Sequence, residues 1–426
     1  MKFPHFLITL SCAITLVHGR PLSARAPLPP SEDPWYTAPE GYEDAAPGTI
    51  LRIRPAADSL VAAIGANVSS IYNILYATTD SFDEPSYAVT TLLIPSKPAR
   101  RNGTRLLSYQ IPYNTVNIDY SPSYALESQF SSAFSDIVPA LGRGWFVNIP
   151  DFEGPLASFS VSVEAAHATL DSLRASLAAG QGLQPNHTRI AQWGYSGGSL
   201  PSEFAAEIAP YYAPEITLSG TAIGGLVANV THALETTNGK PYAGLAMLVT
   251  LGLATRYPEV QGYLDENLKP SGLYNATTFN SAAQMATFEA FSTFANQSTG
   301  DYFLAGNDWL YAPELKPGVE RNWQMGELFT PASPLFVYKA IHDELSPVQD
   351  TDVIMQKYCA DGANILYERN TVGTHQDEYV HGNARAWAWL VSVLDGEYEA
   401  DNCTIRDVTV DEKIPEGLAI LAGVPF

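Results

Sequence analysis

The chain has 426 residues, and its 46% hydrophobic and 11% aromatic content is enough to bury a large core. An excess of 45 acidic over 23 basic side chains gives a formal net charge of −22, which opposes binding to nucleic acids and to anionic lipid headgroups. Only 16% of the residues are charged and no long run of one sign occurs, which also argues against a disordered acidic protein. These values predict a soluble globular protein, either one large α/β domain with insertions or two to three domains.

The N-terminus has the pattern of a secretory signal peptide over residues 1–19. Lys2 gives it a positive start, an apolar stretch runs from Phe6 to Val17, and cleavage is expected near Gly19–Arg20. The stretch is too short to span a bilayer, and a buried N-terminal helix is the alternative. No later apolar run reaches spanning length, so we expect a secreted, extracellular protein without a transmembrane segment.

Two further features agree with an oxidising, secretory environment. Once Cys12 leaves with the signal peptide, Cys359 and Cys403 remain, and they suggest one disulfide, with two buried free thiols as the alternative. Seven Asn-x-Ser/Thr triplets are candidate glycosylation sites, although any one of them can be unused. They begin at Asn67, Asn102, Asn186, Asn229, Asn275, Asn296 and Asn402.

From residue 20 to residue 223 the pattern predicts an extended lead-in followed by alternating strands and helices. Residues 20–47 are rich in proline, alanine and acidic residues, as in a linker. Tyr87–Ile94, Leu106–Ile111 and Trp145–Ile149 are apolar or alternating runs that predict strands. A helix with one apolar face is predicted by Val163, Ala166, Leu170, Leu173 and Leu177. This order predicts an α/β fold with a mostly parallel central sheet and helices on both faces.

The pattern changes to helical periodicity over residues 224–329, which we interpret as a helical lid or cap insertion. Strand signals return at Leu335–Ala340 and Ile365–Glu368, and a long helix is expected over Glu378–Leu394. Residues 330–426 therefore form the second part of the core. The apolar stretch Leu245–Leu253 could be a lid face that meets lipid, or it could be buried against the core.

Gly194-Tyr195-Ser196-Gly197-Gly198 fits the Gly-x-Ser-x-Gly pattern of a nucleophile elbow. The pattern alone is weak, but a strand candidate precedes it directly and a helix candidate, Leu200–Tyr212, follows it. Small flanking residues tolerate the sharp turn, which exposes the serine at the C-terminal end of the sheet. A glycine-rich turn with a structural serine is the alternative.

The serine needs a base and an acid, and where it stands on such an elbow these follow it along the chain in the order acid, histidine. Asp343 comes shortly after the strand Leu335–Ala340, and His375 follows the next strand before a helix. His381 is the second candidate base, and the second candidate acids are Asp350 and Asp352. In this arrangement the histidine takes the proton of Ser196 while the aspartate fixes the histidine tautomer, and the N–H of Gly197 supplies one oxyanion donor.

The chain resembles the fungal secreted lipases of lipase A type, a branch of the α/β-hydrolases. Besides the elbow, the resemblance rests on segments along nearly the whole mature chain. They are Asp33-Pro34-Trp35-Tyr36, Pro47-Gly48-Thr49, Ile94-Pro95-Ser96-Lys97-Pro98, Ser108-Tyr109-Gln110, Ser121-Pro122-Ser123-Tyr124, Ile341-His342-Asp343-Glu344 and Cys359-Ala360-Asp361-Gly362-Ala363-Asn364.

This resemblance implies a triad of Ser196, Asp343 and His375, and a disulfide between Cys359 and Cys403. It also places the family's second oxyanion residue, usually an aspartate, at Asn114, whose amide donates a hydrogen bond without needing a proton. The chain ends 23 residues after Cys403, which is short for the C-terminal flap of lipase A and suggests shorter or more soluble esters.

The sequence therefore predicts a secreted carboxylic-ester hydrolase that cleaves acylglycerols, in transient contact with a lipid interface. The alternative with the same chemistry is an esterase or deacetylase acting on short-chain or acetyl esters of a fungal secondary metabolite. A serine peptidase and a non-catalytic binding protein fit less well, because no peptidase motif is visible and the triad is intact. No metal-ligand spacing or nucleotide loop occurs, so neither a metal nor another cofactor is expected, and nucleic acid is not an expected partner.

Overall fold

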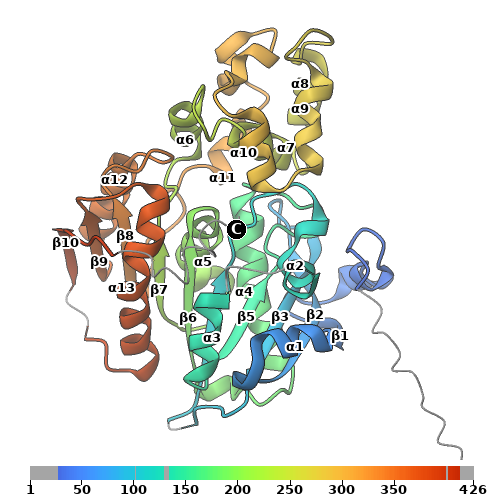
Figure 1. Ribbon diagram of the computed structural model, residues 1–426. Coiled ribbons are helices and arrows are strands. Elements are labelled where there is room, and N and C mark those ends of the chain that lie inside the picture. Colours follow the sequence, from blue (N-terminus) through green and yellow to red (C-terminus); the bar gives the residue numbers. More distant parts are fainter. Residues whose placement is uncertain (1–26, 101, 129–133, 400–401, 413–426) are drawn as a thin grey trace, which may run out of the picture.

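Ten strands form one mixed sheet in the computed structural model, which describes residues 27–100, 102–128, 134–399 and 402–412 (Figure 1). The predicted signal peptide lies outside these residues. The strand order is β1-β2-β3-β5-β4-β6-β7-β8-β9-β10. Their bounds are β1 Ile50–Pro55, β2 Val68–Thr79, β3 Pro85–Pro95, β4 Thr104–Gln110, β5 Phe146–Pro150, β6 Thr188–Tyr195, β7 Leu218–Gly224, β8 Leu335–Ala340, β9 Ile365–Asn370 and β10 Cys403–Val408.

The sheet is parallel from β5 to β10 and antiparallel at the other edge, where β1, β2, β3 and β5 pair. All seven residues of β4 are buried, as expected of a parallel strand with helices on both faces. One face packs against α1 Asp58–Ile64, α2 Pro122–Ser128, α3 Phe134–Gly142 and α13 His375–Asp395. The other packs against α4 Ser162–Ala178, α5 Ser199–Tyr212 and α12 Val348–Ala360. The predicted α/β fold is confirmed, with an antiparallel edge in addition.

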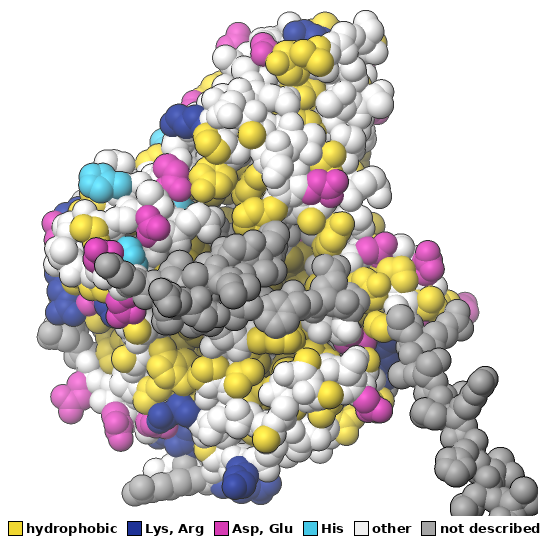
Figure 2. Space-filling model, viewed as in Figure 1, with side chains coloured by type: hydrophobic (Ala, Val, Ile, Leu, Met, Phe, Trp, Pro, Cys, Tyr) yellow, Lys and Arg dark blue, Asp and Glu magenta, His cyan; other side chains and the backbone are white. Residues whose placement is uncertain are grey.

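A block of helices between β7 and β8, which we call the cap (residues 225–334), stands above one end of the sheet (Figure 1). Its α-helices are α6 Val230–Thr237, α7 Leu245–Ala254, α8 Pro258–Asn267, α9 Ala276–Asn280, α10 Thr287–Phe294 and α11 Lys316–Asn322. Every residue of α7 is buried, so the apolar stretch Leu245–Leu253 packs inside the molecule rather than facing outward. Figure 2 shows hydrophobic side chains gathered on this face where the cap meets the core.

The N-terminal lead-in packs against the sheet, and a disulfide links two elements of the core. The lead-in, from Pro27 on, is less extended than expected, because it forms 3-10 turns at Pro34–Tyr36 and Tyr42–Asp44, and Tyr36 is buried against the sheet. The disulfide between Cys359 and Cys403 joins the end of α12 to the start of β10, with the Cα atoms 5.5 Å apart. No helix of the described residues is long and apolar enough to cross a membrane.

Candidate active site

Ser196 lies at the turn between β6 and α5, at the C-terminal end of the central strands. Its φ of 52° is in the left-handed region, which costs energy for any residue with a side chain. The turn is tight because Gly198 packs on the neighbouring strand, where an added Cβ would lie 2.1 Å from the carbonyl oxygen of Gln110. The turn thus aims the hydroxyl out of the sheet, and the positive end of α5 is directed toward it.

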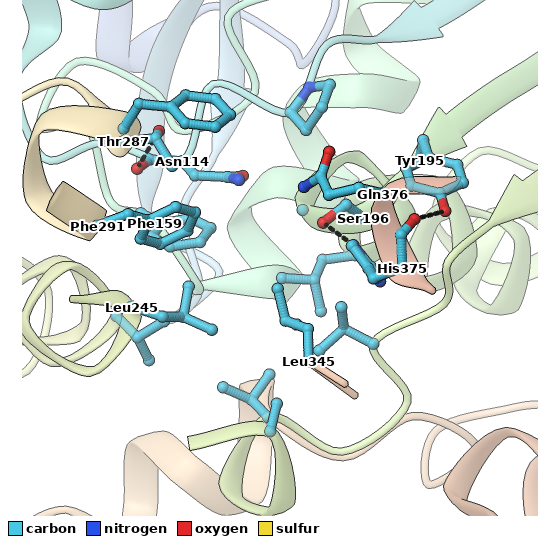
Figure 3. A pocket seen from close by; sticks show the side chains of 18 residues that line it. Asn114, Phe159, Tyr195, Ser196, Leu245, Thr287, Phe291, Leu345, His375 and Gln376 are labelled. Carbon is cyan, nitrogen blue, oxygen red and sulfur yellow. Dashed lines mark hydrogen bonds between the residues drawn. The ribbon is translucent and has the colours of Figure 1, made fainter. Parts of the chain in front are cut away.

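The structure brings Ser196, His375 and Asp343 together in one chain of hydrogen bonds (Figure 3). The Nε2 atom of His375 lies 2.8 Å from Oγ of Ser196, and its Nδ1 atom lies 2.7 Å from Oδ2 of Asp343. Asp343 follows β8, and His375 is the first residue of α13, just after β9. Both side chains are buried, so water does not compete for the hydrogen bond between them.

The carboxylate of Asp343 accepts four hydrogen bonds. Its Oδ1 atom accepts the backbone N–H groups of Leu345 and Ser346 at 2.9 and 2.8 Å, and Oδ2 accepts Nζ of Lys339 at 2.8 Å besides His375. Burial would raise the pKa of Asp343, but the charges of His375 and Lys339 and their hydrogen bonds hold it well below its ordinary value. Asp343 is thus an ionised acceptor that fixes which ring nitrogen of His375 carries a proton.

Three residues that sequence analysis did not single out hold these groups in place. Lys339 is fully buried within β8, and a lysine in that apolar run was the available signal. The hydroxyl of Tyr195 donates to the backbone carbonyl of His375 at 2.5 Å, and Glu344 accepts the backbone N–H of His375 at 2.8 Å. Tyr195 and Glu344 neighbour Ser196 and Asp343 in sequence, but only the folded chain brings them to His375.

Asn114 lies beside the elbow, in the segment that follows β4. An added Cβ on Gly197 would be 1.7 Å from its Oδ1 and 3.0 Å from its Nδ2, so the amide rests against the backbone of Gly197. Among the described residues the buried Oδ1 atom has no hydrogen-bond partner. In Figure 3 the side chain of Asn114 extends from one wall of the cavity toward Ser196. The N–H of Gly197 and the Asn114 amide therefore flank the same space next to the serine.

That space is a cavity between the core and the cap, partly open to solvent (Figure 3). Apart from Asn114, Thr287, His375, Gln376 and the elbow groups, its walls are apolar. They include Phe159, Leu245, Val249, Phe288, Phe291 and Leu345. Such a lining favours an uncharged substrate.

The alternative acids and base make contacts elsewhere. Asp350 pairs with His232 at 2.9 Å, and Asp352 bonds Tyr367 and Arg369. His381 lies on α13 with Nδ1 3.5 Å from the Asn370 amide. None of these side chains contacts Ser196 or His375 in the described part of the chain. Within those same residues no group of three or more His, Cys, Asp or Glu side chains could hold a metal ion.

The seven candidate glycosylation residues differ in exposure. The asparagines at 102, 186, 296 and 402 are exposed, whereas those at 67, 229 and 275 are half-buried. The side-chain nitrogen of Asn229 donates to Gln324 at 2.8 Å, and that of Asn275 donates to the carbonyl of Gly272 at 2.7 Å. Both residues also cap helices, so a glycan would replace existing contacts there.

The sheet order and the strand–elbow–helix turn at Ser196 define a protein of the α/β-hydrolase type. A family model described as "Secretory lipase" matches residues 122–402, and the chain belongs to this secretory lipase family. It is 42% identical to a trichothecene C-3 esterase of Fusarium sporotrichioides over 96% of this chain and 94% of that protein. It is 35% identical to lipase A of Arthroderma benhamiae, over 94% and 87% of the two chains. The closed structure of Candida antarctica lipase A has the same fold, with a TM-score of 0.82 at 24% identity over 93% and 94% of the two chains.

Proposed function

We propose that the chain hydrolyses carboxylic esters through an acyl-enzyme on Ser196. The observation that carries this proposal is the hydrogen-bonded chain from Oγ of Ser196 through His375 to Asp343. His375 takes the hydroxyl proton as Oγ attacks the ester carbonyl, and passes it to the departing alcohol. Water then attacks the acyl-enzyme with His375 again as base, which releases the acid and restores the serine. Asp343 stabilises the imidazolium of both steps.

The negative charge on the carbonyl oxygen in each step needs donors beside Ser196. We assign these to the backbone N–H of Gly197 and the Nδ2 group of Asn114, which flank the cavity. An amide keeps its donor at every pH at which the protein is folded, unlike a carboxylic acid at this position.

For the substrate, we favour a short-chain or acetyl ester of a compact apolar alcohol, such as a trichothecene ester. Two relatives support the trichothecene part of this choice by name, the Fusarium esterase and a probable trichothecene esterase of Stachybotrys chartarum that is 39% identical. The apolar cavity is compatible with such an alcohol. Acylglycerols are the second candidate, favoured by the lipase A relative and by the same apolar walls. In both cases the cap serves as the lid, and the signal peptide over residues 1–19 directs secretion.

The test is a comparison of wild type with Ser196→Ala on p-nitrophenyl esters of two to sixteen carbons, on an olive-oil emulsion and on a 3-acetylated trichothecene. We expect the wild type to release acetate from the trichothecene and to prefer the shortest esters, and Ser196→Ala to lose these activities by at least about 10⁴-fold. Serine-dependent activity that is highest on long chains and emulsion would assign the acylglycerol substrate instead. Full activity of Ser196→Ala would refute the mechanism.

A further inference from the structure

The cap touches the segment that carries Asn114 through the first residue of α10. The hydroxyl of Thr287 contacts two consecutive backbone carbonyls, at 2.7 Å from that of Tyr113 and 3.1 Å from that of Asn114. Thr287 is 3% exposed, so water does not compete well for this hydroxyl. A third contact runs the other way, from Oγ1 of Thr115 to the carbonyl of Met285 at 3.1 Å. Residues 113–115 and 285–287, far apart in sequence, are thus joined by a small buried network.

The backbone of Asn114 has a conformation that needs outside support. Its φ of 45° is in the left-handed region, which an asparagine tolerates but does not prefer. On the core side the segment is held by Tyr113, whose hydroxyl accepts the backbone N–H of Glu153 at 2.7 Å. The two carbonyls that flank the Cα of Asn114 face the cap, and Thr287 is their side-chain donor.

The direction of the Asn114 side chain depends on that backbone. Its Oδ1 atom has no hydrogen-bond partner among the described residues, so no hydrogen bond of that atom fixes the position of the amide. The amide also packs tightly against Gly197, which leaves little room for a shift of the backbone. A movement of the 113–115 segment by a few tenths of an ångström would therefore change the donor geometry next to Ser196.

The same helix forms part of the substrate cavity. Thr287, Phe288 and Phe291 line it from α10. Thr287 and Phe291 lie opposite Ser196 and His375 (Figure 3). A substrate that presses on these phenylalanines acts on the helix that begins with Thr287. The cap is then connected to the reacting carbonyl by a short path of contacts.

We propose that Thr287 is a positioning residue for the oxyanion hole, so that the seated cap completes the site and does not merely cover it. The inference rests on the proposed function, in particular on Asn114 as an oxyanion donor. It predicts that loss of the Thr287 hydroxyl lowers kcat because Asn114 is displaced. It also predicts that contacts between the substrate and α10 change the rate of the chemical step.

The experiment compares Thr287→Val, Thr287→Ser and the control Thr250→Val on p-nitrophenyl acetate. Thr250 is a buried cap threonine whose hydroxyl, among the residues that the structure describes, bonds within its own helix, to the carbonyl of Ala246 at 2.7 Å. Loss of one oxyanion donor costs about 10²–10³ in kcat, so we expect Thr287→Val, which misplaces the donor, to lose roughly 10- to 100-fold with little change in KM. Thr287→Ser is expected to restore most of the rate, and Thr250→Val to keep it.

A double-mutant cycle with Asn114→Ala separates positioning from general damage. We expect Thr287→Val to cause no further loss of kcat in the Asn114→Ala background, because the donor is already absent. The same fold loss in both backgrounds, or a loss no larger than that of Thr250→Val, would overturn the proposal. So would an Asn114→Ala variant with unchanged kcat, in which case the Ser196 mechanism still stands on the Ser196→Ala result. If Thr287→Val does not fold, Thr287→Ala takes its place in the same cycle.

Discussion

Replacing Lys339 with methionine removes the buried ammonium group that contacts Oδ2 of Asp343 at 2.8 Å. Both side chains of this pair are 0% exposed, and the ammonium also donates to the carbonyl of Leu226 at 2.9 Å. Removal of one partner from a buried pair costs about 3–5 kcal/mol, and for Asp343 this is an upper figure because His375 and two backbone N–H groups remain on its carboxylate. For a chain of this size that corresponds to a melting temperature lower by about 4–6 °C.

The same substitution has an electrostatic effect on catalysis. Lys339 and His375 both contact Oδ2 of Asp343, and the charge and hydrogen bond of Lys339 help to hold the pKa of Asp343 below its ordinary value. Without Lys339 the pKa of Asp343 rises, because fewer groups oppose the effect of burial on its carboxyl. A protonated Asp343 no longer accepts the hydrogen bond of His375 as an anion. We therefore expect the acidic limb of the pH profile of kcat/KM to begin at higher pH than in the control variant.

The assay is the pH dependence of kcat/KM on p-nitrophenyl acetate, at a temperature well below the melting transition of each variant. Lys357→Met is the control, since that ammonium is half-exposed and pairs with Glu327 at 3.6 Å, away from the triad. Lys339→Gln serves as a second variant that keeps a donor but not the charge. A folded Lys339→Met protein whose acidic limb coincides with that of the control would refute the electrostatic argument.

Three further predictions concern stability. Burial raises the pKa of Asp151 to about 7, against the hydrogen bonds of Ser123 that lower it, so the folded state holds an extra proton. The stabilisation that follows is complete below about pH 4 and is lost as the pH rises to 7, by up to about 1.4 kcal/mol per pH unit. The free energy of unfolding, measured by urea denaturation, should therefore change less with pH over this range in Asp151→Asn than in the wild type. Equal pH dependence in the two proteins would contradict this. Cys403→Ser removes the disulfide that closes a loop of 44 residues and should lower the free energy of unfolding by about 4 kcal/mol. Reduction of the wild type should lower it as well, and an unchanged free energy of unfolding in the presence of reductant would contradict this. Gly198→Ala places a Cβ against the backbone of Gln110 and should lower both kcat and the melting temperature. The control Gly262→Ala lies on α8, where an added Cβ has nothing within 4 Å, and should stabilise the protein by about 0.5–1 kcal/mol. Similar melting temperatures for the two variants would argue against the tight turn.

The positions of Ser196, Asp343 and His375 could be predicted because each follows a strand with a strong local pattern. Apolar runs bounded by turn residues mark β6, β8 and β9, and the carboxyl ends of parallel strands meet at one edge of a sheet. The sheet itself was predicted for the same reason. Its antiparallel edge was not, because β1 and β2 pair through contacts that local periodicity does not encode.

The groups that tune the site were beyond prediction from the sequence alone. The contacts of Tyr195 and Glu344 with the backbone of His375 depend on side-chain directions in the folded chain. The helix α13 begins at His375, three residues before the predicted start at Glu378, because a capping box of Thr374 and Asp377 fixes its first turn. The contact between Thr287 and residues 113–114 joins two segments that have no shared pattern.

The cap is attached unevenly, and this bears on how a bulky ester can enter. Near α7 the guanidinium of Arg256 pairs with the buried carboxyl of Glu164 at 2.6 Å, and the hydroxyl of Ser160 donates to the carbonyl of Val249 at 3.1 Å. Burial raises the pKa of Glu164 to about 7 although Arg256 lowers it, so separating this pair would leave a buried polar group without its partner.

On the α10 side the link to residues 113–115 consists of neutral hydrogen bonds, each worth about 1 kcal/mol. Breaking these contacts therefore costs less on the α10 side than on the α7 side, where a buried ion pair is lost. If Thr287 acts as we propose, the movement that admits a large substrate also releases Asn114. Esters that fit beneath a seated α10 are then turned over faster than larger ones that bind equally well, because only they react with both oxyanion donors in place.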